Sequence, residues 1–206
     1  MIPHASRTGT RRNLALLREA EWRLFVSAKG VLRTEGFPYA LDNGAWTAHT
    51  QGEPFDVPAF EKALDLLGAD ADFVIAPDIV AGGRASLDLS LSWLDRLDDA
   101  RMVLIPNQDG LEPEDFEGIV SPRVGIFHGG STEWKVDQMV RWGRWCAVRD
   151  VYFHVGRVNT GPRFRLAHVA GANSVDGSSA SRFAVNIPML DGLARQGDLF
   201  NARAMS

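Results

Sequence analysis

The sequence predicts an α/β fold, a compact (β/α)8-type TIM barrel with room for irregular or missing units. Short apolar runs rich in Val, Ile and Phe recur along the chain, each is followed by a turn rich in Gly, Pro, Asp or Asn, and amphipathic stretches separate them. Strands without clean polar alternation are typical of a parallel sheet covered by helices on both faces. Six or seven such units favour a barrel, and a doubly wound open sheet is the alternative.

The predicted elements alternate between strands and helices from residue 23 onward. The apolar runs are RLFVSA (23–28), PYALDNGAW (38–46), DFVIAPDIVAGG (72–83), MVLIPNQDG (102–110), VGIFHGG (124–130), VYFHVGR (151–157) and NSVDGSS (173–179). The amphipathic stretches cover residues 57–69, 84–97, 131–148 and 161–171, with a final helical segment after 179. No Pro/Gly/Ser-rich linker divides the 206 residues, so we expect a single barrel domain over residues 1–206.

The composition is ordinary for a globular protein, with 45% apolar and 23% charged residues. No apolar run is long enough to span a bilayer, and the N-terminal segment lacks the apolar stretch of a signal peptide. We therefore expect a cytoplasmic protein with no membrane partner. The single cysteine, Cys146, lies in an apolar helical pattern and is expected to be buried, as are the tryptophans at 134, 142 and 145.

The charges are distributed unevenly along the chain. Residues 1–120 carry 11 basic and 20 acidic side chains, whereas residues 121–206 carry 11 basic and 6 acidic ones, which together give the net charge of -4. This balance argues against a protein that simply coats nucleic acid, but it allows a locally positive face toward a polyanion. Solvated arginines on helix faces are the alternative interpretation.

Polar and glycine-rich groups follow the apolar runs directly. Because the C-terminal ends of parallel strands form the site in barrels and open sheets alike, we expect these groups to meet at one mouth. A single aspartate at a strand end more often caps the next helix. Three at equivalent positions, Asp42, Asp78 and Asp176, allow one to act as nucleophile or base and another to contact donor groups of a substrate.

Histidines and glycines at the strand ends are further candidates. His128 and His154 each end a strand, where an imidazole can donate to a substrate oxygen. Gly129 and Gly130 supply turn geometry or let the backbone approach a flat ligand. The histidines and the cysteine show no metal-ligand spacing, and neither a phosphate-binding glycine motif nor a nucleophilic serine elbow occurs. We expect neither a metal nor a cofactor.

Taken in order, these motifs resemble those of the tRNA-guanine transglycosylase superfamily, closest to its zinc-free phage and bacterial relatives that place 7-deazaguanine bases in DNA. The resemblance runs from ALDNGAW to the region after VDGSSASR. It implies a (β/α) barrel that exchanges guanine for a modified base through a covalent glycosyl-enzyme intermediate on an aspartate.

Five motifs carry the resemblance and imply roles for individual residues. ALDNGAW is similar to the segment with a general acid/base aspartate, here Asp42, and APDIV to the segment whose aspartate reads the edge of the base, here Asp78. LIPNQDG implies a base-contacting Gln108, and FHGGS implies that Gly129 and Gly130 contact the base through their backbone. GANSVDGSSASR makes Asp176 the covalent nucleophile.

The chain also departs from the tRNA-acting enzymes. Those enzymes carry a structural zinc held by several cysteines and a histidine near the C-terminus, whereas this chain has one cysteine and continues for 30 residues beyond Asp176. ALDNGAW has N-G-A-W in place of the family's S-G-G-F. The resemblance therefore implies no zinc subdomain, and DNA as substrate in preference to tRNA.

We predict a DNA-guanine transglycosylase, a pentosyltransferase whose partners are guanine-containing DNA and a free 7-deazaguanine base, in the host cytoplasm if it is phage-encoded. Arg157 and Arg182 lie nearest the strand ends and are expected to hold the substrate. Phosphates beside the mouth would contact further arginines, at 141, 144, 149, 163 and 165. A DNA glycosylase that releases a base by hydrolysis and a non-catalytic nucleobase- or DNA-binding barrel are the alternatives. A homodimer is compatible with each of these functions.

Overall fold

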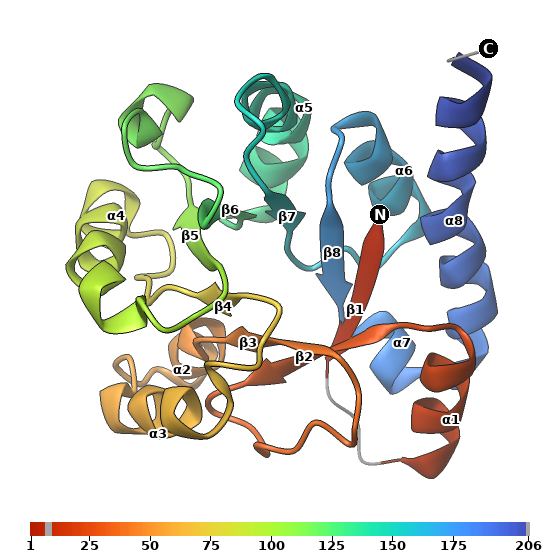
Figure 1. Ribbon diagram of the computed structural model, residues 1–206, viewed down its shortest axis with the longest axis horizontal. Helices are drawn as coiled ribbons and strands as arrows, with labels where there is room; N and C mark the ends of the chain where they lie inside the picture. The colour runs from red at the N-terminus through yellow and green to blue at the C-terminus, as the bar shows by residue number, and fades with distance from the viewer. Residues whose placement is uncertain (7–9, 205–206) are drawn as a thin grey trace.

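Eight parallel strands close into a barrel in the computed structural model, which describes residues 1–6 and 10–204, with side chains up to residue 195 (Figure 1). The strands are β1 (Ile2–Ser6), β2 (Arg23–Ser27), β3 (Tyr39–Asp42), β4 (Val74–Ile75), β5 (Val103–Asn107), β6 (Val124–His128), β7 (Phe153–Val155) and β8 (Ser174–Gly177). Each strand pairs with its neighbours in the sequence, which confirms the predicted TIM barrel and excludes an open sheet.

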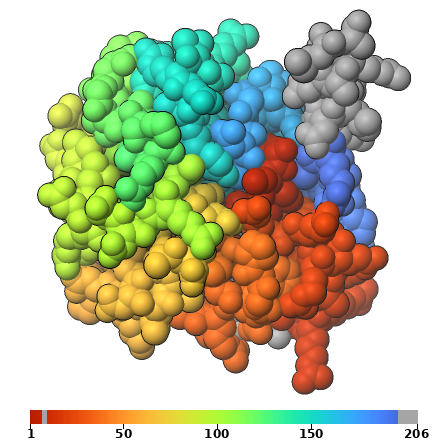
Figure 2. Space-filling model, in the orientation of Figure 1, coloured from red at the N-terminus to blue at the C-terminus, as the bar shows by residue number. Residues whose placement is uncertain are grey.

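The barrel closes where β1 pairs with β8. Ile2 lies opposite Ser174 and His4 opposite Asp176 in this parallel pair, and Figure 1 shows the red β1 beside the blue β8. In the space-filling view the red N-terminal segment also lies against the blue segment (Figure 2). The sequence predicts no strand here, because IPHAS contains Pro3 and His4 and lacks a run of β-branched residues.

Helices surround the strands, although not after every strand. The α-helices are α1 (Arg11–Glu19), α2 (Ala45–Gln51), α3 (Val57–Leu67), α4 (Gly83–Ser92), α5 (Thr132–Val148), α6 (Gly161–Val169), α7 (Ser179–Arg182) and α8 (Ile187–Ala204), and the 3-10 helices are η1 (Leu94–Leu97), η2 (Pro113–Phe116) and η3 (Ala184–Asn186). Residues 28–38, all described, join β2 to β3 without an α-helix, and only η2 follows β5. These are the irregular units that the sequence leaves room for. Among the helices described, none is long and apolar enough to cross a membrane.

The apolar side chains form two separate clusters. The larger one joins strand residues such as Leu24 and Val26 to helix residues such as Phe60 and Trp142, and so fills the layer between strands and helices. Cys146 and Trp142 are buried in this layer, as predicted, whereas Trp134 and Trp145 pack against it and are only partly buried. The smaller cluster contains Phe25, Ala40, Phe73, Ile75 and Leu104, and the rings of His4 and His154 pack against two of its members. It occupies the interior of the barrel, as the inward side chains of TIM-barrel strands do.

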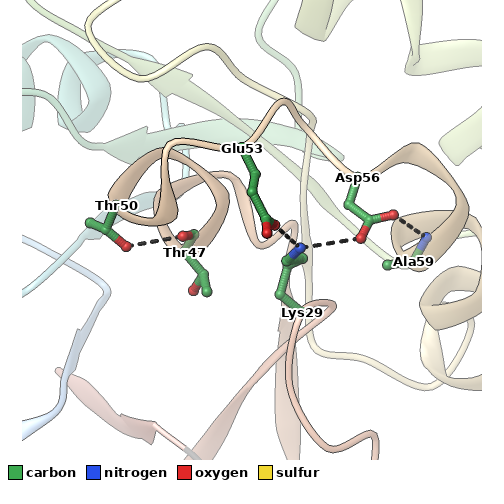
Figure 3. A network of polar contacts seen from close by, with 6 residues as sticks. All are labelled: Lys29, Thr47, Thr50, Glu53, Asp56 and Ala59. Carbon is green, nitrogen blue, oxygen red and sulfur yellow. Dashed lines mark hydrogen bonds and ion pairs between the residues drawn. The ribbon is translucent and has the colours of Figure 1, made fainter.

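Lys29 connects the loop between β2 and β3 to the segment between α2 and α3. The Lys29 ammonium donates to the carboxylates of Glu53 (2.7 Å) and Asp56 (3.3 Å), and Asp56 in turn caps α3 by accepting from the Ala59 N–H (3.1 Å) (Figure 3). Figure 3 also shows the Thr50 hydroxyl bonded to the carbonyl of Thr47 on α2. The contacts of Lys29 attach the irregular loop to the segment between α2 and α3.

We expect Phe60→Ala to lower the free energy of unfolding by about 3–5 kcal/mol, because Phe60 is fully buried on α3 against Phe55 and Trp93. Leu66→Ala, on the same helix but with Leu66 61% exposed, should cost less than about 1 kcal/mol. Urea unfolding followed by circular dichroism measures both values. Equal losses for the two variants would show that α3 does not bury this face.

Candidate active site

A cavity of about 830 Å³ opens at the C-terminal ends of the strands. Eight of the ten site residues predicted from the sequence line it: Asp42, Asp78, Gln108, Gly129, Gly130, Arg157, Asp176 and Arg182. They come from the ends of β3 to β8, so the parallel barrel brings together groups that lie up to 140 residues apart in the chain. The predicted convergence on one mouth is therefore observed.

Asp176 is the most buried of the three aspartates. It lies on β8, its side chain is 8% exposed, and one oxygen, Oδ1, accepts hydrogen bonds from His154 Nε2 (3.1 Å) and from the Arg157 N–H (3.3 Å). Its other oxygen, Oδ2, accepts no hydrogen bond from the described residues. The carboxylate is thus held at one oxygen and has the second one available.

Asp42 ends β3 and differs from Asp176 in its electrostatic surroundings. The Gly44 N–H donates to Asp42 Oδ2 (3.3 Å), and Ser27 lies opposite in the strand register. Burial raises the pKa of Asp42 to about 7 against the opposing effect of the Ser27 hydroxyl, and the charges of Asp176 and Asp78 add to the rise. A carboxyl that remains substantially protonated at neutral pH can donate a proton as well as accept one.

Asp78 belongs to a cluster of amides at the ends of β3, β4 and β5. Asn43 Nδ2 donates to Asp78 Oδ1 (2.7 Å), and Gln108 Nε2 donates to Asp78 Oδ2. Burial raises the pKa of Asp78 to about 6, although both hydrogen bonds favour the ionised form. Gln108 is 2% exposed, and its carbonyl oxygen has no partner among the described residues. This oxygen is buried without a donor from the protein, while the Nε2 of the same amide is held by Asp78.

Arg157 bridges the mouth of the cavity. Its guanidinium donates to the Gly130 carbonyl and lies 4.1 Å from the centre of the Trp46 ring, which comes from α2 on the other side. Its backbone has a positive φ of 57°, a conformation that costs a non-glycine residue about 1–2 kcal/mol. This strain places the Arg157 N–H against Asp176 and the guanidinium over Trp46.

Gly130 is required by its surroundings. It has a positive φ of 79°, and a Cβ there would lie 2.5 Å from an Asp109 carboxylate oxygen and 2.9 Å from the Trp134 ring. The Asp109 carboxylate in turn accepts from the backbone N–H of Ser131 (2.7 Å), which caps α5. The loop therefore presents bare backbone to the cavity, as expected for contact with a flat ligand.

The two histidines predicted to bind substrate lie outside the cavity lining. His128 is fully buried, with one ring nitrogen 3.0 Å from the Asn107 side chain and the other donating to the Lys135 carbonyl (2.9 Å). Burial lowers the pKa of His128 to about 3, so its ring is neutral and both nitrogens are occupied. His154 is also fully buried, with one ring nitrogen bonded to Asp176 and the other to Ser174. A position near a strand end does not reveal whether a side chain points outward from the barrel or inward below its mouth.

The arginines predicted to hold phosphates are dispersed. Arg157 and Arg182 line the cavity. Arg141 instead pairs with Glu112 (2.5 Å), and Arg149, at the C-terminal end of α5, pairs with Glu117 and stacks on Trp145. Since α5 begins at the mouth end of β6, its C-terminal end lies toward the opposite face of the barrel. Arg149 therefore cannot contact a substrate at the mouth.

Several lining residues carry no role in the sequence-based prediction. Trp46, Phe25 and Phe127 supply aromatic surface to the cavity, and Asn43 orients Asp78. Trp46 and Asn43 lie inside ALDNGAW, so their position directly after a strand end was a usable signal. Phe25 and Phe127 lie within apolar runs, where nothing in the sequence distinguishes them from core residues.

In the described part of the chain, no group of three or more His, Cys, Asp or Glu side chains is arranged to hold a metal ion. No protein-family model matches this sequence, and no curated protein matches it. The arrangement of the cavity itself is therefore the basis for assigning a function.

We expect Asp42→Asn to stabilise the protein by about 2 kcal/mol at pH 8 and by less than half of that at pH 5. Because the pKa of Asp42 is raised on folding, the folded state binds the proton more tightly, and this contribution is lost as pH rises through 7. Asparagine removes the buried charge, so the free energy of unfolding rises. Such an increase in stability is common when a functional group is deleted. Asp65→Asn, which removes an exposed carboxylate on α3, is the control, and urea unfolding at both pH values gives the comparison. A gain independent of pH would contradict the raised pKa.

Proposed function

We propose that this protein is a DNA-guanine transglycosylase, which exchanges guanine in DNA for a 7-deazaguanine base through a covalent intermediate on Asp176. The observation that carries the proposal is the asymmetry of Asp176, whose Oδ1 is held by two N–H groups while Oδ2 is unpaired at a cavity that also contains Asp42, Asp78 and Gln108. The motif resemblance supports the same assignment.

The cavity offers groups that match the edge of guanine. Guanine and 7-deazaguanine bases share an N1–H and an N2 amino group as donors and O6 as acceptor. The Asp78 carboxylate is an acceptor for these donors. The Gly130 N–H makes no hydrogen bond among the described residues and borders the same cavity for O6, whereas the Gly129 N–H already donates to Asn107. Trp46 and Phe127 supply aromatic faces for a planar base.

In this mechanism Asp176 is the nucleophile and Asp42 is the general acid and base. Asp176 Oδ2 attacks C1′ of the deoxyribose, the C1′–N9 bond breaks, and its electron pair leaves with guanine, which takes a proton from the Asp42 carboxyl. The incoming base then returns its N9 proton to Asp42 and attacks C1′ through N9, and the C1′–O bond to Asp176 breaks. Two displacements on the same carbon retain its configuration, as in retaining glycosidases.

The target nucleotide must leave the base stack to reach this depth. The cavity volume of about 830 Å³ lies in the range of sites that accept a nucleoside-sized ligand. Arg182 lines the cavity and makes no ion pair among the described residues, so its guanidinium is available to a phosphate.

Incubation of the protein with guanine-labelled single-stranded and duplex DNA, with and without a 7-deazaguanine base, tests this proposal. We expect labelled guanine to be released and the 7-deazaguanine to appear in the DNA by nucleoside mass spectrometry. Asp176→Ala should abolish both by at least about 10³-fold, because no other described side chain provides the nucleophile. Asp65→Asn should behave as wild type.

Other outcomes have defined meanings. Guanine release without incorporation, leaving abasic sites, would indicate a DNA glycosylase. Binding of DNA or base without release, unaffected by Asp176→Ala and lost on changing Arg182, would indicate a non-catalytic binding barrel. Exchange on tRNA in preference to DNA would contradict the choice of substrate.

The pH dependence provides a second prediction. Asp42 must be protonated to assist the leaving guanine, and its pKa of about 7 predicts that kcat/KM falls above about pH 7. Asp42→Asn should remove this basic limb and lower kcat/KM by about 10²–10⁴-fold. Steady-state rates of base exchange measured from pH 5 to pH 9 define the basic limb of the kcat/KM profile. A profile that stays flat up to pH 9 would show that Asp42 does not act as the acid.

A further inference from the structure

We propose that His154 is a positioning residue for Asp176, and that a buried hydrogen-bonded row from Tyr152 through Ser174 to His154 selects Asp176 Oδ2 as the reacting oxygen. This inference rests on the proposed function for its catalytic consequence, but the arrangement itself is independent of the substrate.

The row runs through the interior of the barrel along β7 and β8. The Tyr152 hydroxyl lies 2.9 Å from Ser174 Oγ, Ser174 Oγ lies 2.7 Å from His154 Nδ1, and His154 Nε2 lies 3.1 Å from Asp176 Oδ1. His154 and Ser174 are opposite each other in the register and are fully buried, and Tyr152 is half-buried.

The Asp176 carboxylate at one end of the row fixes which atom carries the hydrogen in each of its hydrogen bonds. An ionised carboxylate only accepts, so His154 Nε2 must carry hydrogen. Burial lowers the pKa of His154, so the ring is neutral and Nδ1 is an acceptor. The single hydroxyl hydrogen of Ser174 therefore goes to Nδ1, and the Tyr152 hydroxyl donates to Ser174. One tautomer of His154 satisfies all three contacts.

The imidazole is also held by packing. Phe25 and Phe127 lie nearly parallel to it, at 7° and 15°, with ring centres 5.6 and 5.2 Å away. Phe73 (5.1 Å) and His4 (5.7 Å) contact it at steep angles. With four rings around it and both nitrogens bonded, the imidazole cannot rotate without losing a hydrogen bond in a buried place, which is costly. The same Phe25 and Phe127 side chains line the cavity.

These contacts orient the carboxylate of Asp176. His154 Nε2 and the Arg157 N–H both donate to Oδ1, so Oδ1 has its lone pairs engaged while Oδ2 does not. Nucleophilic attack needs a lone pair aimed at C1′ and held at close distance, and small displacements are costly in rate. The row therefore fixes which oxygen reacts, without touching the substrate.

Other charged or titratable groups also influence Asp176. They are Asp42 on β3, Lys135 on α5, Arg157 after β7 and His154 on β7, and His4 lies opposite Asp176 on β1. The Lys135 ammonium donates to the Gly156 carbonyl, and burial lowers its pKa to about 7. A variant that alters only His154 leaves the other four groups in place, so any change in Asp176 comes from the loss of His154.

Two substitutions of His154 separate its hydrogen bond from its packing. His154→Phe keeps a ring among the four neighbours but removes the donor, whereas His154→Gln keeps an N–H that can reach Oδ1. We expect His154→Phe to lower kcat by about 10- to 100-fold with little change in KM, and to move the acid limb of kcat/KM up by about one pH unit, because losing a donor makes the carboxylate easier to protonate. His154→Gln should restore both to within about fivefold and about 0.3 pH unit. Ser174→Ala should lie between them, since it frees the ring to change tautomer.

The control is Phe73→Leu, which loosens the packing against His154 without removing a hydrogen bond. It should lower the melting temperature and leave the acid limb where it is in wild type. If His154→Phe does not fold, Ser174→Ala carries the test alone. The proposal would be overturned if the acid limb of kcat/KM coincided with that of wild type in Ser174→Ala and in any folded His154→Phe.

A measurement without substrate keeps this proposal separate from the proposed function. With aspartate labelled at the carboxyl carbon, NMR follows the ionisation of Asp176, which should occur at higher pH in His154→Phe than in wild type and His154→Gln. If wild type shows no base exchange but Asp176 ionises at higher pH in His154→Phe, the proposed function is wrong and the positioning role of His154 stands. If exchange occurs but the difference is absent, the positioning fails and the function holds.

Discussion

The pairing of β1 with β8 is the constraint on which the rest of the structure depends. It closes the sheet, and closure gives every strand an inside and an outside. Only in a closed barrel do the ends of β3, β4, β5 and β8 face one another across a cavity, and only there are His154 and Asp176 both buried. The hydrogen bond between them is strengthened by that burial.

The interior combines apolar packing with polar groups that a simple core would exclude. Phe25, Phe73 and Phe127 fill the barrel around the imidazole of His154, while the carboxyl groups of Asp42 and Asp78 are desolvated at its upper end. Desolvation is unfavourable for stability and raises the pKa of both acids. The barrel thus places three aspartates in three different electrostatic environments, which allows them to perform different tasks.

The irregular parts of the barrel shape the mouth. The β2–β3 connection has no α-helix, and it contributes Gly30 and Val31 to the cavity wall while Lys29 ties it to Glu53 and Asp56 (Figure 3). Opposite this wall, the strained backbone of Arg157 directs one side chain over Trp46 and one N–H to Asp176. Backbone strain of this kind is usual where a fixed scaffold must hold a site in one geometry.

The sequence by itself determined the α/β class with parallel strands, the order of its units from residue 23 onward and the acids at their ends, because continuous apolar runs and the polar residues that end them are local patterns. Asp42, Asp78, Gln108 and Asp176 could be chosen on that basis. The tertiary structure alone decided what depends on distant pairing: that the sheet closes through IPHAS, that His128 is buried against α5 and that His154 lies beneath Asp176. Which face a side chain takes, and what it meets there, is set by the register between strands and not by the residue itself.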